Sequence, residues 1–242
     1  TFVVTVILAR ILLPEDFGLV SLGLIAINYL EIFNNFGIST ALIYRQDNPE
    51  ETANAAFYIN MLIGVILLIT GMAVAPWVGD FFSEPRLIDI LRVLSINFLI
   101  TSLGSIHASL LSKNLNFKKR VIPSIGKSIS KGTVSIIMAL MGYGVWSLVW
   151  GQVVGELVVA MLYWRAMPWL PRFNFSWGDT RPLLVYGWQI ALVGLIGMVH
   201  KNIDYLLIGR RMDSTQLGYY TISFRLPELI IINIVSMIGQ TV

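Results

Sequence analysis

The sequence lacks cysteine, and its 242 residues include only two histidines and 13% charged residues. Without cysteine the chain cannot form disulfides or offer a thiolate to a metal. His107 and His200 are far apart and fit no ligand spacing, so we expect no metal site and no cofactor. A Gly-rich phosphate loop, a nucleophile elbow and a triad pattern are also missing, which argues against an enzyme.

What the sequence does contain is long hydrophobic runs. Hydrophobic residues make up 56% of the chain and the mean hydropathy is +0.73. The runs are continuous over about 20 residues, which favours spanning helices over the ~10-residue alternating strands of a barrel. We therefore predict an all-α integral membrane protein. The net charge of +3 is spread over loops and favours an anionic ligand and a fixed membrane orientation over nucleic acid.

The hydrophobic runs predict eight helices in two groups. They cover residues 1–12, 17–36, 55–78, 87–111, 120–141, 145–164 and 183–208, and the last begins near Leu217. We expect a six-helix lobe at 1–164, a linker at 165–182 with two prolines and interleaved Trp, Phe and Arg, and the start of a second lobe at 183–242. The chain starts inside an apolar run at Thr1, so we expect an N-terminal fragment with a truncated first helix.

The basic residues of the loops predict the orientation. One set of loops holds Arg45, Lys113, Lys118, Lys119, Arg120, Arg165, Arg172 and Arg181. The opposite set holds Arg10, Arg86, Arg92, Arg210 and Arg211. By the positive-inside tendency the first, larger set is cytoplasmic, and we expect the N-terminus to be cytoplasmic too.

Two lysines interrupt the fifth predicted helix. Lys127 lies roughly 10 Å along the helix from Arg120, so its ammonium either snorkels to the headgroups or lines a polar path. Lys131 lies about 16 Å deep, near the middle of a ~30 Å hydrocarbon core, where a lysine needs a partner or water. We predict that Lys131 lines a cavity, with Ser124, Ser128 and Ser135 on the same helical face.

Two acids also lie within predicted spans. Glu31 and Glu156 each either pair with a lysine of the fifth helix or titrate as a coupling site for protons or sodium. Asn28 and Gln152 are expected to hydrogen-bond between helices and are the candidates for polar lining of a cavity.

The later helices carry further charged candidates. Asp204 lies three residues after Lys201, a spacing that predicts an ion pair on one helix face. Arg225 falls early in the last helix and is a candidate for the cavity wall of the second lobe. Arg10, at the end of the first helix, either anchors at the membrane interface or contacts a ligand.

A weak internal repeat connects the two groups of helices. Ala9-Arg10 followed by Phe17-Gly18 aligns with Gly209-Arg210 followed by Leu217-Gly218, a shift of 200 residues. Each pair lies at the end of one apolar helix and the start of the next. The match predicts a second lobe related to the first, and coincidence between two similar turns is the alternative.

Several separated segments resemble one transporter family. They are ILARILLPEDFGLVSLGLIA, FNNFGISTALIYRQD, LRVLSINFLITSLGSIHASLLSKNLNFKKR, PRFNFSWGDTRPLLVYG and NIDYLLIGRRMDSTQLGYYTISFRLPE. These resemble the Wzx-type polysaccharide and O-antigen flippases of the multidrug/oligosaccharidyl-lipid/polysaccharide exporter superfamily, in particular the colanic-acid-exporter-like branch.

The resemblance implies a function. A member of this family would move an undecaprenyl-diphosphate-linked oligosaccharide to the outer leaflet of the bacterial inner membrane, by alternating access of two helical lobes. A polysaccharide polymerase and a chain-length regulator would be its partners. Arg45 and Arg120 would then receive the diphosphate at the cytoplasmic mouth, or they are simply solvated loop residues.

Two other functions remain open from the residues. A multidrug exporter of the same superfamily, coupled to sodium or protons, is one alternative, although cationic drugs would favour an acidic cavity over a basic one. A membrane-embedded polysaccharide polymerase or ligase is the other, although such an enzyme would need a large outward loop and the outward loops here are short.

Overall fold

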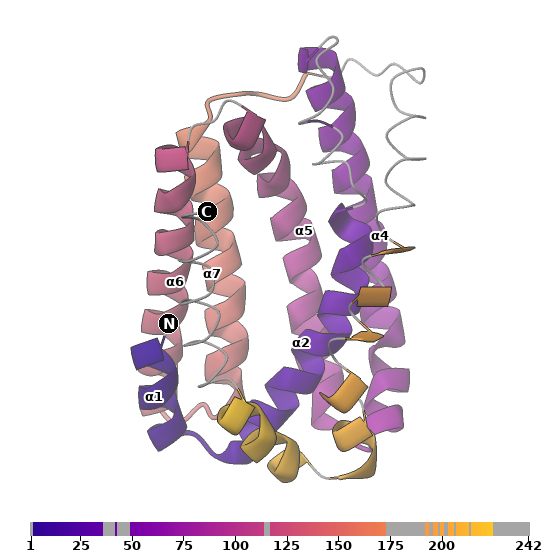
Figure 1. The fold of residues 1–242 in the computed structure, drawn as a ribbon, viewed down its shortest axis with the longest axis vertical. Coiled ribbons are helices and arrows are strands. Elements are labelled where there is room, and N and C mark those ends of the chain that lie inside the picture. The colour runs from indigo at the N-terminus through magenta and orange to yellow at the C-terminus, as the bar shows by residue number, and fades with distance from the viewer. Residues whose placement is uncertain are drawn as a thin grey trace, which may run out of the picture.

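The computed structural model describes residues 2–35, 42, 49–113, 117–172, 192–193, 196–197, 199–200, 203–205, 207–212 and 214–224. Over these residues it contains helices and no strand, which confirms the all-α prediction. Figure 1 shows long helices packed side by side. Their bounds are α1 Phe2–Ile11, α2 Pro14–Asn35, α4 Pro49–Phe82, α5 Arg86–Lys113, α6 Phe117–Leu140 and α7 Val145–Ala166.

Helix length and composition confirm a multi-pass membrane protein. Three stretches in the described part of the chain, residues 51–82, 86–113 and 145–166, are long and apolar enough to cross a bilayer. The helix α6 is not among them, because Lys127 and Lys131 interrupt its apolar run.

The helix connections gather at two ends of the bundle. The α1–α2 turn, the α4–α5 turn and the α6–α7 link lie together at the lower end in Figure 1, which we call the turn end. The α6–α7 link needs glycine, since Gly142 and Gly144 have φ of 82° and 52°. The opposite end carries Lys113, Lys119, Arg165 and Arg172, and we call it the basic end.

Three helices begin three or more residues earlier than the sequence predicted. The starts predicted at Phe17 and Ala55 are wrong, since α2 begins at Pro14 and α4 at Pro49. Proline fits the first position of a helix, because its missing N–H would have had no intrahelical partner there and its φ is already helical. The helix α6 begins at Phe117 and not at the predicted residue 120, so Pro123 lies inside the helix.

The main core lies where α2, α4, α5 and α7 meet. Its fully buried side chains include Leu22 from α2, Phe98 from α5 and Val149 from α7. Full burial of each such side chain contributes roughly 1.5–3 kcal/mol. This core holds the first part of the chain together as one helical body.

Small residues let α4 and α5 approach closely. A Cβ atom at Gly71 would overlap Ser95 Oγ, and one at Gly64 would overlap Ser102 Oγ and lie 3.0 Å from Phe98 O. Ser95 Oγ donates to Leu91 O at 2.7 Å, which satisfies the hydroxyl within its own helix. Close approach of small residues is a usual way for helices to associate in a membrane.

At the basic end, the segment that follows α7 packs onto α5. His107 is fully buried, and its Nε2 donates to Trp169 O at 3.1 Å. The His107 ring stacks on Trp164 with ring centroids 4.4 Å apart. The Arg172 N–H donates to Asn54 Oδ1 at 2.8 Å, so residues 167–172 are tied to the first helical body. Trp169 therefore contributes to packing within the protein.

We predict that Gly71→Ala lowers the free energy of unfolding in detergent by about 1–3 kcal/mol, because the new methyl group overlaps Ser95 Oγ. The double variant Gly71→Ala/Ser95→Ala should recover part of that loss. Gly197→Ala is the matched control, because nothing lies within 4 Å of a Cβ at that position. Equal thermal stability of all three variants would contradict this account of the α4–α5 contact.

Candidate functional site

The candidate site forms between α6 and α7, which run antiparallel. A Cβ atom at Gly151 would overlap Ser135 Oγ, and one at Gly155 would lie 3.1 Å from Lys131 Cβ. These two glycines let α7 approach the face of α6 that bears the lysines. Lys127 and Lys131 are four residues apart on α6, so in the antiparallel register two α7 side chains with the same spacing lie opposite them.

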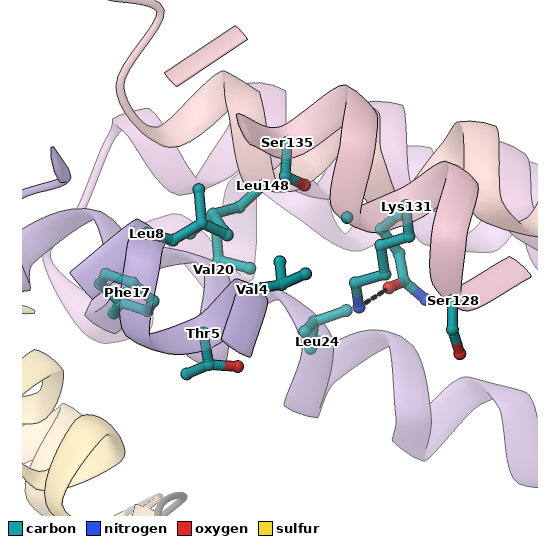
Figure 2. Close-up of a pocket in the computed structure, with 12 residues that line it drawn as sticks. Val4, Thr5, Leu8, Phe17, Val20, Leu24, Ser128, Lys131, Ser135 and Leu148 are labelled. Carbon is teal, nitrogen blue, oxygen red and sulfur yellow. Dashed lines mark hydrogen bonds between the residues drawn. The ribbon is translucent and has the colours of Figure 1, made fainter. Parts of the chain in front are cut away.

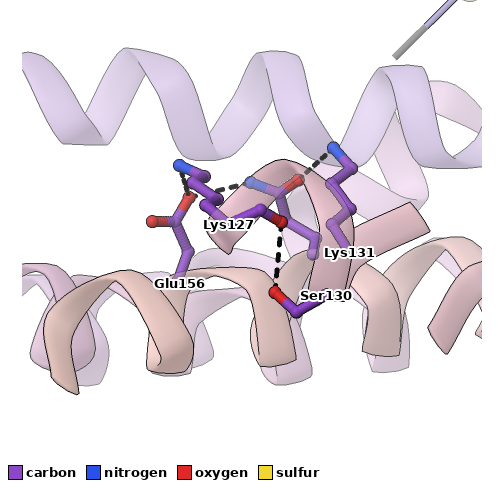
Figure 3. Close-up of polar contacts among 5 residues, drawn as sticks. Lys127, Ser130, Lys131 and Glu156 are labelled. Atoms are coloured by element: carbon purple, nitrogen blue, oxygen red, sulfur yellow. Dashed lines mark hydrogen bonds and ion pairs between the residues drawn. The ribbon is translucent and has the colours of Figure 1, made fainter. Parts of the chain in front are cut away.

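The two side chains opposite the lysines are Gln152 and Glu156. Lys131 Nζ donates to Gln152 Oε1 at 2.5 Å, and Lys127 Nζ pairs with Glu156 Oε1 at 2.5 Å. Gln152 Nε2 also donates to Glu156 Oε1, at 3.0 Å, which joins the four residues into one network (Figure 3). We call these four residues the lysine network. The structure therefore shows the pairing of Glu156 with a lysine of α6 that the sequence had left as one of two alternatives.

The burial of the network differs along its length. The Glu156 side chain is 12% exposed and the Lys127 side chain 36% exposed. Glu31, on α2, is half-buried and lies within electrostatic reach of both. Two carboxylates and two ammonium groups thus come close together within the helical bundle, and a membrane interior tolerates such groups mainly when they are paired or hydrated.

Lys131 also lies on the wall of a pocket. The pocket has a volume of about 180 Å³ and lies between α1, α2, α6 and α7 (Figure 2). Most of its wall is apolar, formed by Val4, Leu8, Phe17, Val20, Leu24, Gly132 and Leu148, and its polar groups are Thr5, Ser128, Lys131, Ser135 and Gln152. Lys131 is the cation among these lining residues. The pocket can therefore hold an anionic group against a largely apolar wall.

The other predicted site residues do not join this pocket. The side chains of Asn28 and Ser124 are exposed and are not part of its lining. Arg10 is exposed in the last turn of α1. Asp204 accepts a hydrogen bond from Tyr220 Oη at 2.5 Å in the later part of the chain. Lys201, Arg45, Arg225 and the side chain of Arg120 lie outside the described residues.

The sequence did not indicate the apolar half of the pocket. Val4, Leu8 and Phe17 have no feature that distinguishes them from other apolar residues in membrane helices. Ser135 shares a helical face with Lys131 and could be found from that spacing. The Ser135 hydroxyl is buried and has no hydrogen-bond partner among the described residues. It lies against Gly151, where a Cβ atom would overlap it. Among the residues described, no group of three metal-ligating side chains comes together.

Comparison with known proteins identifies relatives. Residues 7–242 match a family model described as "Polysaccharide biosynthesis protein". The succinoglycan biosynthesis transport protein ExoT of Rhizobium meliloti is 26% identical over 94% of this chain and 46% of its own length. The teichuronic acid biosynthesis protein TuaB of Bacillus subtilis is 26% identical over 85% and 43%. The lipopolysaccharide biosynthesis protein WzxC of Escherichia coli is 22% identical over 90% and 45%.

The chain thus spans about half the length of these relatives. No solved structure matches it.

We predict that a water-soluble thiol reagent labels Lys131→Cys in membranes and leaves Ile129→Cys unlabelled. Ile129 is 63% exposed on the same helix and is expected to face lipid, whereas Lys131 lines the pocket. The sequence contains no cysteine, so each variant carries one reactive thiol. Labelling of Ile129→Cys alone would contradict the pocket.

We also predict that Glu156→Gln lowers the free energy of unfolding in detergent. The change leaves the Lys127 ammonium without its carboxylate. The expected loss is about 1–3 kcal/mol, less than the roughly 3–5 kcal/mol of a fully buried pair, because water partly reaches Lys127. The double variant Lys127→Met/Glu156→Gln should recover part of the loss. Unchanged stability of Glu156→Gln, with export that depends differently on the ion gradient, would favour ion coupling instead.

Proposed function

The chain belongs to the polysaccharide biosynthesis protein family, and from this we propose that it forms part of a transporter for lipid-linked oligosaccharides. The transporter carries an undecaprenyl-diphosphate-linked repeat unit from the cytoplasmic to the outer leaflet of a bacterial inner membrane. Relatives named for succinoglycan biosynthesis transport and lipopolysaccharide biosynthesis support this assignment.

One observation carries the proposal: Lys131 lies near the middle of α6, among helices of membrane-spanning length, and on the wall of a pocket. A diphosphate cannot enter hydrocarbon alone, since unpaired polar groups there cost several kcal/mol each. A lysine at the centre of a spanning helix costs about 2.5–3.5 kcal/mol on insertion scales, so it is rarely found there without a function. A mid-membrane ammonium next to a pocket offers the charge that the diphosphate needs.

The lysine network suggests how the anion is accepted. In the structure Gln152 and Glu156 supply oxygen acceptors to the two lysines. A diphosphate brings several charged oxygens, and an ammonium attracts a charged oxygen more strongly than the neutral amide oxygen of Gln152. We propose that phosphate oxygens replace Gln152 Oε1 on Lys131, while Glu156 stays with Lys127. Binding is then an exchange of acceptors, and the lysine is never left without a partner.

The names of the relatives are consistent with a site that recognises the diphosphate of the lipid carrier and not the sugar. They refer to three different polysaccharides, succinoglycan, teichuronic acid and lipopolysaccharide. A site shared by transporters of different sugars would contact what their substrates have in common. In this proposal the common part is the lipid diphosphate, and lysine suits it because an ammonium acts as a compact point charge for phosphate oxygens.

The transport step proposed here is alternating access of two lobes. The basic end faces the cytoplasm, as the larger number of lysines and arginines in its loops suggests. The lipid head enters from that end, reaches Lys131 near the middle of α6, and leaves at the turn end once the lobes have rocked. The lipid tail remains in the bilayer throughout, so only the diphosphate and the sugars need a polar route.

We predict that Lys131→Ala reduces surface polysaccharide roughly tenfold or more in a strain that depends on this protein, because a charge-assisted bond of about 1.5–3 kcal/mol is lost. Lipid-linked repeat units should accumulate inside the cell. Lys131→Arg should retain part of the export, since it keeps the charge. Lys119→Ala is the control: it removes the same charge from an exposed position at the basic end. Normal export with correctly inserted Lys131→Ala protein would refute the proposal.

A further inference from the structure

The two turns that the internal repeat aligns are in contact with each other. A Cβ atom at Gly18, in the first turns of α2, would overlap Ser214 O and lie 3.0 Å from Gly218 N. A Cβ atom at Gly218 would overlap Pro14 O. The backbones of residues 14–18 and 214–218 therefore touch directly, with no side chain between them.

This contact is reciprocal. Gly18 meets Ser214, and Gly218 meets Pro14, so each glycine contacts the residue four positions before its counterpart. The partners in both contacts are related by the same shift of 200 residues as the repeat. A reciprocal contact of this kind is what a two-fold axis produces between two copies of one surface. The contact therefore supports a true repeat over a chance match between similar turns.

The apolar side chains around the glycines follow the same rule. Ile222 packs against the cluster that contains Phe17, and Leu217 lies in the cluster that contains Leu22. The two pairs are again related by a shift of 200 residues. The contact thus extends over about two helical turns on each side.

The contact lies at the turn end of the bundle. In Figure 1 the yellow helical segment that includes residues 214–224 lies against the α1–α2 turn. The contact is far along the bundle from the basic end. Two lobes that rock about the membrane centre can open the turn end by separating here and at the adjoining contact of Gly209 with Leu22 and Phe82.

We propose that residues 14–18 and 214–218 form a seal that closes the turn end, and that this seal opens once in each transport cycle. We call it the glycine seal. The inference rests on the proposed function, because it assumes that two lobes alternate. It gives Gly18 and Gly218 a role in transport that is separate from substrate binding at the lysine network.

Glycine suits a seal that must open repeatedly. Backbone against backbone excludes water closely, and few side chains, Leu217 and Ile222 among them, would have to repack when the contact opens. The α4–α5 contact at Gly71 differs, since both of its helices belong to the first part of the chain. The same residue type therefore makes a permanent contact within a lobe and a separable contact between lobes.

Cross-linking tests the seal directly. Leu13 and Gln216 are exposed beside the two turns, so a double variant Leu13→Cys/Gln216→Cys can be joined by a short bifunctional maleimide. We expect efficient cross-linking in membranes and a loss of export of roughly tenfold or more, as for a blocked step. A linker with a cleavable bond should restore export on cleavage. Each single-cysteine variant, treated in the same way, is the control.

Two results of this experiment would overturn the proposal. Normal export by the cross-linked protein would show that the turns stay together throughout the cycle. Failure of the pair to cross-link in folded protein would show that the turns are not in contact.

A second measurement does not depend on the substrate. Gly18→Ala cannot fit the closed seal, so it should increase labelling of Asn28→Cys by an impermeant thiol reagent applied from the turn-end side several-fold. Gly71→Ala, a crowded change within one lobe, should leave that labelling unchanged. Unchanged labelling with Gly18→Ala would also refute the seal.

The two proposals can fail separately. Normal export by Lys131→Ala together with a labelling response to Gly18→Ala would refute the substrate site and keep the seal. Impaired export by Lys131→Ala, together with unchanged labelling in Gly18→Ala, would keep the substrate site and refute the seal.

Discussion

The structure depends on how two ammonium groups are kept satisfied inside a membrane. Lysine at mid-span is tolerated only with acceptors close by, and here both acceptors come from one neighbouring helix. They reach the lysines because Gly151 and Gly155 bring the α7 backbone close to α6. A larger residue at either position would move Gln152 and Glu156 away together, so the helix packing and the charge pairing form a single constraint.

The same constraint explains what could be predicted from the sequence. Hydrophobic runs of membrane length indicate an all-α protein. Lys131 stands out because a charge at that depth needs a partner or water. The partner of Glu156 could not be chosen, because the relative rotation of two helices depends on which small residues face each other. Helix starts were missed at Pro14 and Pro49, where proline begins a helix although it is often read as ending one.

The pocket shows the limit of such reasoning more clearly. Its polar wall includes Lys131 and Gln152, which the sequence indicated, whereas Val4 and Leu8 belong to it only because α1 packs against α6. Nothing in the sequence distinguishes an apolar residue that lines a cavity from one that faces lipid or a neighbouring helix. The repeat gave the opposite result: an alignment of four positions, two of them identical, is weak by itself and acquires weight because Gly18 and Gly218 contact each other's turns reciprocally.

Gln152 and Glu156 have one further consequence when no substrate is present. A small anion such as chloride carries one charge, whereas a diphosphate carries several charged oxygens, so chloride competes less well with Gln152 Oε1 for Lys131. Such an anion would also lose its hydration shell on entering the pocket. In the transporter proposed above, both lysines therefore keep an oxygen acceptor while no substrate is bound.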